Sequence, residues 1–254
     1  MIRLDATRVR AVIRKELRDY RRNRFIFLTM TITPVLFLAL PMIDIFLIKA
    51  SASSAALNRR LGLSLIYMLL LPVLIPATLS ASAVVGERDQ GTLEPMLTTP
   101  IRREEFILGK ALAVLLPSLA ISYAVFGVFL ACVRLFANSV VATGVFHQGP
   151  VLLAQVLFTP LLAGWAIWVG MAVSARSSDV RVAQQLSTLA SLPPVGVAGL
   201  MSMNVIHPTF TLALMLAVAL LAIDVLALRI VSALFDRERL VTGVKASSSF
   251  GPTS

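Results

Sequence analysis

Six predominantly apolar runs, each at least 20 residues long, restrict this chain to very few folds. A bilayer's hydrocarbon core is about 30 Å thick and an α-helix rises about 1.5 Å per residue, so roughly 20 apolar residues cross it. In lipid every backbone N–H and C=O must be paired within the element, and none of these runs shows the period-two alternation of membrane strands. We therefore predict an all-α integral membrane protein with six transmembrane helices. The predicted spans are residues 25–48, 61–85, 111–133, 151–173, 186–205 and 209–234.

Charge supports this class and predicts an orientation. Only 14% of the 254 residues are charged, whereas soluble domains have about 25%. All but four of the 23 lysines and arginines lie on the side that the N-terminus, the second and fourth loops and the C-terminus share. The positive-inside rule places that side, with both termini, in the cytoplasm. Because the bases cluster at membrane boundaries and no soluble domain presents them, the net charge of +10 does not indicate nucleic-acid binding.

The two ends of the chain differ in character. In residues 1–24 apolar side chains recur at helical spacing, and arginine and lysine cover much of the rest. We predict an amphipathic interfacial helix held at the membrane lipids by apolar burial and arginine contacts, with contact to a cytosolic partner left open. Residues 25–235 form the transmembrane domain, and the serine-rich residues 236–254 are expected to be a disordered cytoplasmic tail. The apolar positions of the first helix are Val9, Val12, Ile13, Leu17 and Tyr20.

Between the second and third spans lies a polar segment, residues 86–110, with five acidic and four basic side chains. Gly91, Pro95 and Pro100 predict that it is divided into short helices. We interpret the segment as a docking element that receives force from a soluble partner. The alternative is a solvated loop without a partner.

Two features inside the predicted spans point to a transport pathway. Pro193 and Pro194, followed by Gly196 and Gly199, should interrupt the fifth helix, and irregular backbone at that depth must be buried in protein or line a cavity. Asp224 lies within the sixth span, where an acidic residue is a functional candidate by default. A structural polar contact for Asp224 is an equal alternative.

Motifs for catalysis are missing from the sequence. Gly109-Lys110-Ala111 does not complete a Walker A loop, so the chain cannot itself be an ATPase. His147 and His207 have no cysteine or acidic cluster at ligand spacing, which argues against a metal site. No nucleophile motif or paired-acid site is present either, so we predict a protein that is not an enzyme and binds no cofactor.

The polar segment resembles the region between the second and third spans of type-2 ABC transporter permeases, the six-helix membrane subunits of bacterial exporters. A second stretch is similar to the fourth loop and fifth span of the same family. The usual Ser-Gly pair at the outer end of the fifth span is not found, which leaves the branch of the family open. The first stretch matches at Glu87, Gly91-Thr92-Leu93-Glu94, Leu97, Thr99-Pro100, Arg103, Glu105, Leu108 and Gly109-Lys110. The second matches at Gly170-Met171, Ser174-Ala175-Arg176, Ala183-Gln184-Gln185 and Pro193-Pro194.

This resemblance implies a coupling helix within residues 87–97 that sits in a groove of a separate ATP-binding subunit, where ATP and magnesium are bound. It also implies a dimer with a second permease subunit, with spans two and five lining the pathway, in the bacterial inner membrane. Gly91 would permit the turn that starts the coupling helix. The expected docking residues are Glu87, Arg88, Gly91, Thr92, Leu93, Glu94 and Leu97.

The expected function is therefore ATP-driven export of a hydrophobic drug-like or lipid-like compound, or of sodium. A secondary transporter driven by an ion gradient, with Asp224 as the ion carrier, is the alternative from another class. It would be expected to show inverted repeats with paired broken helices, and only one helix here has the required interruption. A membrane-embedded enzyme would need a clustered nucleophile or metal constellation that the sequence does not contain.

Overall fold

The computed structural model describes residues 5–47, 54–89, 91, 102–147, 149–202 and 210–234. Within these ranges all regular structure is helical, which confirms the predicted class. The helices are α1 Ala6–Arg22, α2 Arg24–Phe46, α3 Ser54–Ala81, α4 Val85–Asp89, α6 Arg103–Phe136, α7 Ser139–Phe146, α8 Gly149–Arg176, α9 Val180–Ser191, α10 Pro193–Ser202 and α11 Phe210–Leu234.

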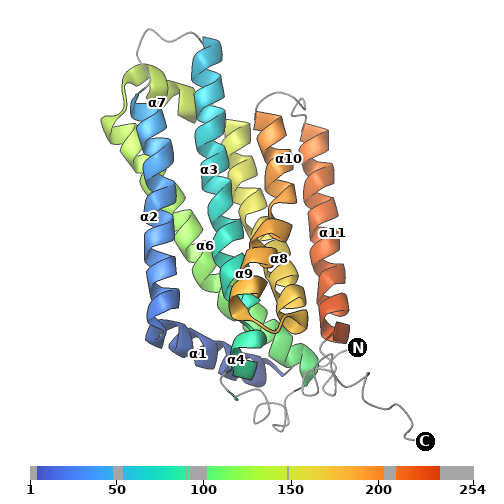
Figure 1. Ribbon diagram of the computed structural model, residues 1–254. Helices are drawn as coiled ribbons and strands as arrows, with labels where there is room; N and C mark the ends of the chain where they lie inside the picture. Colours follow the sequence, from blue (N-terminus) through green and yellow to red (C-terminus); the bar gives the residue numbers. More distant parts are fainter. Residues whose placement is uncertain are drawn as a thin grey trace, which may run out of the picture.

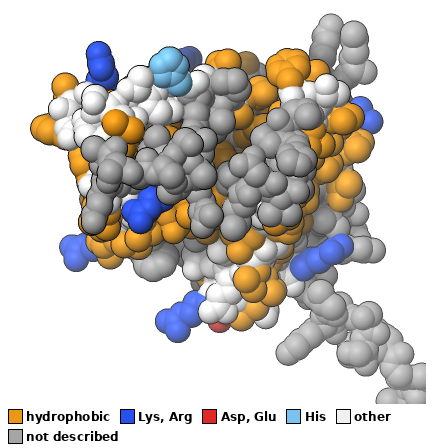
Figure 2. Space-filling view, turned by 90° about the horizontal axis from the view of Figure 1, so that it is seen from above, with side chains coloured by type: hydrophobic (Ala, Val, Ile, Leu, Met, Phe, Trp, Pro, Cys, Tyr) orange, Lys and Arg blue, Asp and Glu red, His pale blue; other side chains and the backbone are white. Residues whose placement is uncertain are grey.

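The long helices lie side by side in a bundle, and α1 crosses one end of it (Figure 1). The short helix α4 lies at the same end as α1, and α7 lies at the opposite end. Seen along the bundle, hydrophobic side chains cover much of its rim (Figure 2). A bundle with an apolar rim is what a helical protein surrounded by lipid requires.

Five helices in the described part of the chain are long and apolar enough to cross a membrane. They correspond to the first, second, third, fourth and sixth predicted spans. The protein is therefore a multi-pass membrane protein. The five segments are Ile26–Phe46, Arg60–Glu87, Glu104–Phe136, Leu152–Arg176 and Phe210–Val231.

The fifth predicted span is divided into two helices, α9 and α10, as the two prolines predict. Pro193 has no N–H to continue the ladder, and a proline ring clashes with the carbonyl four residues earlier. The last turn of α9 tightens instead, with the Leu192 N–H donating to the Leu189 carbonyl at 3.3 Å. The ladder resumes when the Gly196 N–H donates to the Leu192 carbonyl at 3.0 Å.

The helix that contains the third predicted span is longer than that span and begins within the polar segment. Residues 103–110 are the first two turns of α6, which runs unbroken from Arg103 to Phe136. No proline lies between Pro100 and Pro117, and Glu104 and Glu105 in the first turn favour a helix start at Arg103. The polar segment therefore ends in a long helix.

At the centre of the bundle is α3, since 72% of its most apolar window is buried, against 11% for α2 and 6% for α11. Its backbone approaches α8 closely at one point. A Cβ added at Gly170 would overlap the Ser80 side chain and lie 3.2 Å from the Ala81 backbone nitrogen. A larger residue at position 170 would push these two helices apart. The surrounding core includes Leu71, Ile75, Val114, Ile167 and Met171.

Candidate functional site

The helix α1 lies against the first turns of α6 through its apolar face. Val9, Val12 and Tyr20 are buried. A Cβ added at Gly109 of α6 would lie 2.7 Å from the Val12 Cβ, so the two helices touch where α6 has no side chain. Protein therefore covers the apolar face that the sequence suggested would lie in lipid.

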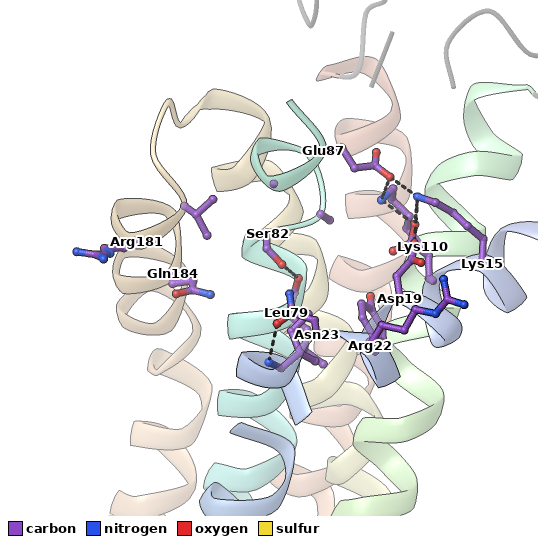
Figure 3. A pocket seen from close by; sticks show the side chains of 16 residues that line it. Lys15, Asp19, Arg22, Asn23, Leu79, Ser82, Glu87, Lys110, Arg181 and Gln184 are labelled. Carbon is purple, nitrogen blue, oxygen red and sulfur yellow. Dashed lines mark hydrogen bonds and ion pairs between the residues drawn. The ribbon is translucent and has the colours of Figure 1, made fainter. Parts of the chain in front are cut away.

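Four charged side chains from three helices meet beside this contact (Figure 3). Lys15 Nζ lies 2.7 Å from Glu87 Oε1 and 3.2 Å from Glu16 Oε1. Lys110 Nζ lies 3.0 Å from Glu87 Oε1 and 3.1 Å from Glu16 Oε1. Lys110 is also 5.1 Å from the centroid of the Phe106 ring. We call Lys15, Glu16, Glu87 and Lys110 the ion cluster; it joins α1, α4 and α6.

The ion cluster is largely removed from solvent. The Lys110 side chain is 1% exposed, whereas that of Lys15 is 40% exposed. Burial alone would lower the pKa of Lys15, but its hydrogen bond to Glu87 and the charge of Glu16 raise the pKa above its usual value. Burial would raise the pKa of Glu16, yet the charges of Lys110 and Lys15 hold that pKa below its usual value. Lys15 and Glu16 therefore stay charged at neutral pH.

A second carboxylate holds the beginnings of two helices. The Asp5 N–H, at the start of α1, donates to Glu105 Oε1 at 2.9 Å. The Arg102 N–H, at the start of α6, donates to Glu105 Oε2 at 3.0 Å. Because the first backbone donors of a helix have no partner within it, one buried side chain fixes both starts next to each other.

The start of α4 is attached to α8 by one hydroxyl. Ser174 Oγ accepts hydrogen bonds from the backbone N–H groups of Val84 and Val85, at 3.0 and 3.2 Å. All three residues are buried. Together with the ion cluster, this contact joins α4 to α1, α6 and α8.

Replacing Ser174 by alanine is expected to destabilise the protein by about 1–3 kcal/mol, because two buried N–H groups lose their acceptor. Amide hydrogen exchange at Val84 and Val85 should accelerate. The matched control is Ser118→Ala, since the buried Ser118 hydroxyl donates to the Val114 carbonyl of its own helix. Equal effects of the two substitutions on these amides would contradict the assignment.

A cleft of about 820 Å³ separates the ion cluster from α9 (Figure 3). Lys15, Asp19 and Glu87 lie on one side of it, and Arg181 and Gln184 of α9 lie on the other. Beside the cleft, Ala183 of α9 packs against Ala81 and Val85, so α9 also contacts α4.

The structure brings together only part of the expected docking residues. The Glu87 carboxylate is buried and paired with Lys15 and Lys110 inside the chain. Arg88 lies within α4, and Gly91 has a φ of +67°, a left-handed conformation that favours glycine. The other four expected docking residues, Thr92, Leu93, Glu94 and Leu97, lie outside the described residues.

The pathway candidates lie elsewhere in the bundle. Asp224 of α11 faces α8, where a Cβ added at Gly164 would be 2.6 Å from its Oδ2 atom. Asp224 Oδ1 is buried and has no hydrogen-bond partner within the described ranges. Pro193 is exposed and Pro194 half-buried at the beginning of α10. The structure does not bring the two prolines and Asp224 into one described cavity.

Sequence reasoning missed the partners of Glu87. Lys110 and Ser174 were noted for their match to a family, but no role was assigned to them. A signal for Glu16 was present, because its position falls among the apolar side chains of the N-terminal helix. An acid on the buried face of an amphipathic helix indicates a basic partner, since an unpaired buried charge is costly.

Comparison with known proteins gives one family. A family model described as "ABC-2 family transporter protein" matches residues 10–223, which include most of α1, all of α4, α6 and α8, and the ion cluster. No curated protein matches the chain.

Proposed function

Since the chain belongs to the ABC-2 family of transporter proteins, we propose that it is the membrane subunit of an ATP-driven exporter. Membership of this family supports a membrane component of an ABC transporter. We infer that ATP hydrolysis lies in a separate subunit. The proposed cargo is a hydrophobic drug-like or lipid-like compound, or sodium. ATP and magnesium would bind to the partner and not to this chain.

One observation supports the proposal most: both ends of the connection between α4 and α6 are attached to the same set of helices. Its beginning is held by Ser174 and by Glu87 of the ion cluster. Its end leads into α6, whose start Glu105 ties to α1. Force applied to residues 90–101 would therefore act on α1, α4, α6 and α8 together, as a rigid-body transmission requires.

The broken helix completes the proposed architecture of six spans. Residues 180–202 number about as many as a helix needs to cross the hydrocarbon core, although neither α9 nor α10 is long enough alone. With six spans, the positive-inside rule places both termini and α1 on the cytoplasmic side of a bacterial inner membrane. We further propose a dimer with a second permease subunit and a disordered tail at residues 236–254.

The proposal can be tested with Glu94, which lies in the segment expected to dock. Co-expressed with its ATP-binding subunit, Glu94→Arg is expected to reduce co-purification of that subunit and substrate-stimulated ATP hydrolysis to background. Membrane insertion should be unchanged. The matched control is Glu104→Arg, the same charge reversal in the first turn of α6. If the subunit still co-purifies and hydrolysis is still stimulated, the docking assignment is wrong.

The partnerless Asp224 Oδ1 atom favours one second candidate, a secondary transporter that carries an ion on this carboxyl. Asp224→Asn separates the two functions, because the amide keeps the size of the side chain and removes its ionisable proton. Under the exporter proposal, ATP-driven transport in vesicles continues close to the wild-type rate. Under the secondary-transporter alternative, transport driven by an ion gradient without any ATPase is present in the wild type and lost in the variant.

A further inference from the structure

An unbalanced row of positive charge runs along α1. Arg10, Arg14, Arg18 and Arg21 follow one another at i+4 and i+3 spacing, so their side chains share one face of the helix. All four are exposed. Like charges at this spacing slightly destabilise an isolated helix, so an external counter-charge would stabilise the row. We call these four residues the arginine stripe.

The acidic residues of α1 do not neutralise the stripe. Glu16 is buried in the ion cluster, and Asp19 Oδ2 lies 3.6 Å from Lys15 Nζ. Within the described ranges, no residue of the arginine stripe forms an ion pair with an acid. An anionic partner of the stripe would therefore come from outside the described part of the chain.

The apolar face of α1 is turned largely to protein, with Ile13 and Leu17 half-buried against the core. Val9, Val12 and Tyr20 are buried, and Val12 packs directly onto Gly109 of α6. An interfacial helix usually inserts such a face between the lipids. Charge is therefore the main attraction that α1 offers to a membrane surface.

The place of α1 in the fold selects the partner. Asn23 alone separates α1 from α2, so the two helices form a corner at the end of the bundle (Figure 1). Near that corner Phe27, Leu28 and Ile32 of α2 are exposed and apolar, as lipid-facing side chains are. Lipids covering them have their headgroups at the level of α1. Glu16 binds Lys110, which in turn binds Glu87 of α4, and Glu16 lies on the opposite side of α1 from the stripe.

We propose that the arginine stripe binds the phosphate groups of anionic phospholipids in the cytoplasmic leaflet, by charge alone and without insertion of α1. This inference rests on the proposed function, which places α1 on the cytoplasmic side of the membrane. Guanidinium groups bind phosphate with paired hydrogen bonds, and basic residues near an anionic surface gain affinity that salt screens. The lipid would thereby fix the position of α1, and with it the ion cluster that holds α4.

The test uses the full chain in nanodiscs of phosphatidylcholine with a fixed share of phosphatidylglycerol. Spin-labelled lipids report the relative association constant of the two headgroups. Arg10, Arg14, Arg18 and Arg21 are changed together to glutamine. The wild-type preference for phosphatidylglycerol should fall at least about ten-fold, since each basic residue near the surface contributes roughly five-fold. High salt should produce the same loss in the wild type.

Two control variants identify the cause. Changing the four arginines to lysine should keep most of the preference, because the charge remains. Arg176→Gln with Arg181→Gln, which removes two exposed arginines outside the stripe, should lower the preference much less than the glutamine variant of the stripe does. If the glutamine variant of the stripe keeps the wild-type preference, the inference is wrong. The inference is also wrong if the glutamine variant keeps its preference for phosphatidylglycerol but loses the ATP-binding subunit. The partner of the stripe would then be an acidic protein surface.

A labelling experiment separates failure of the inference from failure of the proposed function. Arg14→Cys, in a chain with Cys132→Ala, is treated with a membrane-impermeant maleimide. Labelling only in inside-out vesicles supports the orientation on which the inference rests. Labelling from the outer side would overturn the orientation, and with it both the proposed function and the lipid site.

Discussion

Replacing Lys110 by methionine is expected to destabilise the folded chain by about 3–5 kcal/mol, the usual cost of removing one partner from a buried ion pair. Lys110 is 1% exposed and lies within 3.1 Å of both Glu16 and Glu87. Without it, two buried carboxylates share one half-exposed lysine, Lys15. The loss should appear as a lower unfolding midpoint in detergent and as reduced association with the ATP-binding subunit.

Two further variants test the cause. Lys15→Met should cost less than Lys110→Met, because Lys15 is 40% exposed and water screens its charge. Combining Lys110→Met with Glu16→Gln should recover part of the stability, since the Lys15–Glu87 pair at 2.7 Å remains. If the double variant is no more stable than Lys110→Met alone, charge pairing is not what makes Lys110 necessary.

Gly170→Val is expected to destabilise the bundle by about 3 kcal/mol, at the upper end of the range for overpacking. The added Cβ would overlap the Ser80 side chain and lie 3.2 Å from the Ala81 backbone nitrogen. Because backbone stands on both sides of this contact, α3 and α8 would have to separate. The measurement is equilibrium unfolding in mixed micelles.

A matched glycine provides the control for this substitution. A Cβ added at Gly127 of α6 would meet no atom within 4 Å, so Gly127→Val should be nearly neutral. A smaller substitution, Gly170→Ala, places its Cβ against the Ser80 side chain, which Ser80→Gly removes. The double variant with both substitutions should therefore be more stable than Gly170→Ala alone. Equal destabilisation by the valine variants at 127 and 170 would show that the α3–α8 contact is not the cause.

The sequence predicted the features of the fold that depend on local pattern. Runs of apolar residues predicted five of the helices, and Pro193 predicted the break between α9 and α10. The start of α6 at Arg103 was not predicted, because the prolines at 95 and 100 suggested only that residues 86–110 are divided into short helices. Helix ends in a polar segment depend on partners such as Glu105, whose contact with Asp5 joins residues far apart in the chain.

The candidate site was less predictable than the fold. Glu87 was singled out as a docking residue, whereas the structure pairs it with Lys15 and Lys110. These partners come from two other helices, and no spacing within one helix indicates such a contact. Only the position of Glu16 among apolar residues gave a local signal that α1 packs against a basic group.

The central claim is that nucleotide-driven work enters this subunit through the connection between α4 and α6. The test uses Glu94→Cys in a chain with Cys132→Ala. Cross-linking of this variant to the co-expressed ATP-binding subunit is measured in inside-out vesicles. The account predicts a cross-link whose yield changes when ATP is bound. If the Glu94→Cys variant is labelled from the outer side of the membrane and never cross-links to that subunit, work does not enter through this connection.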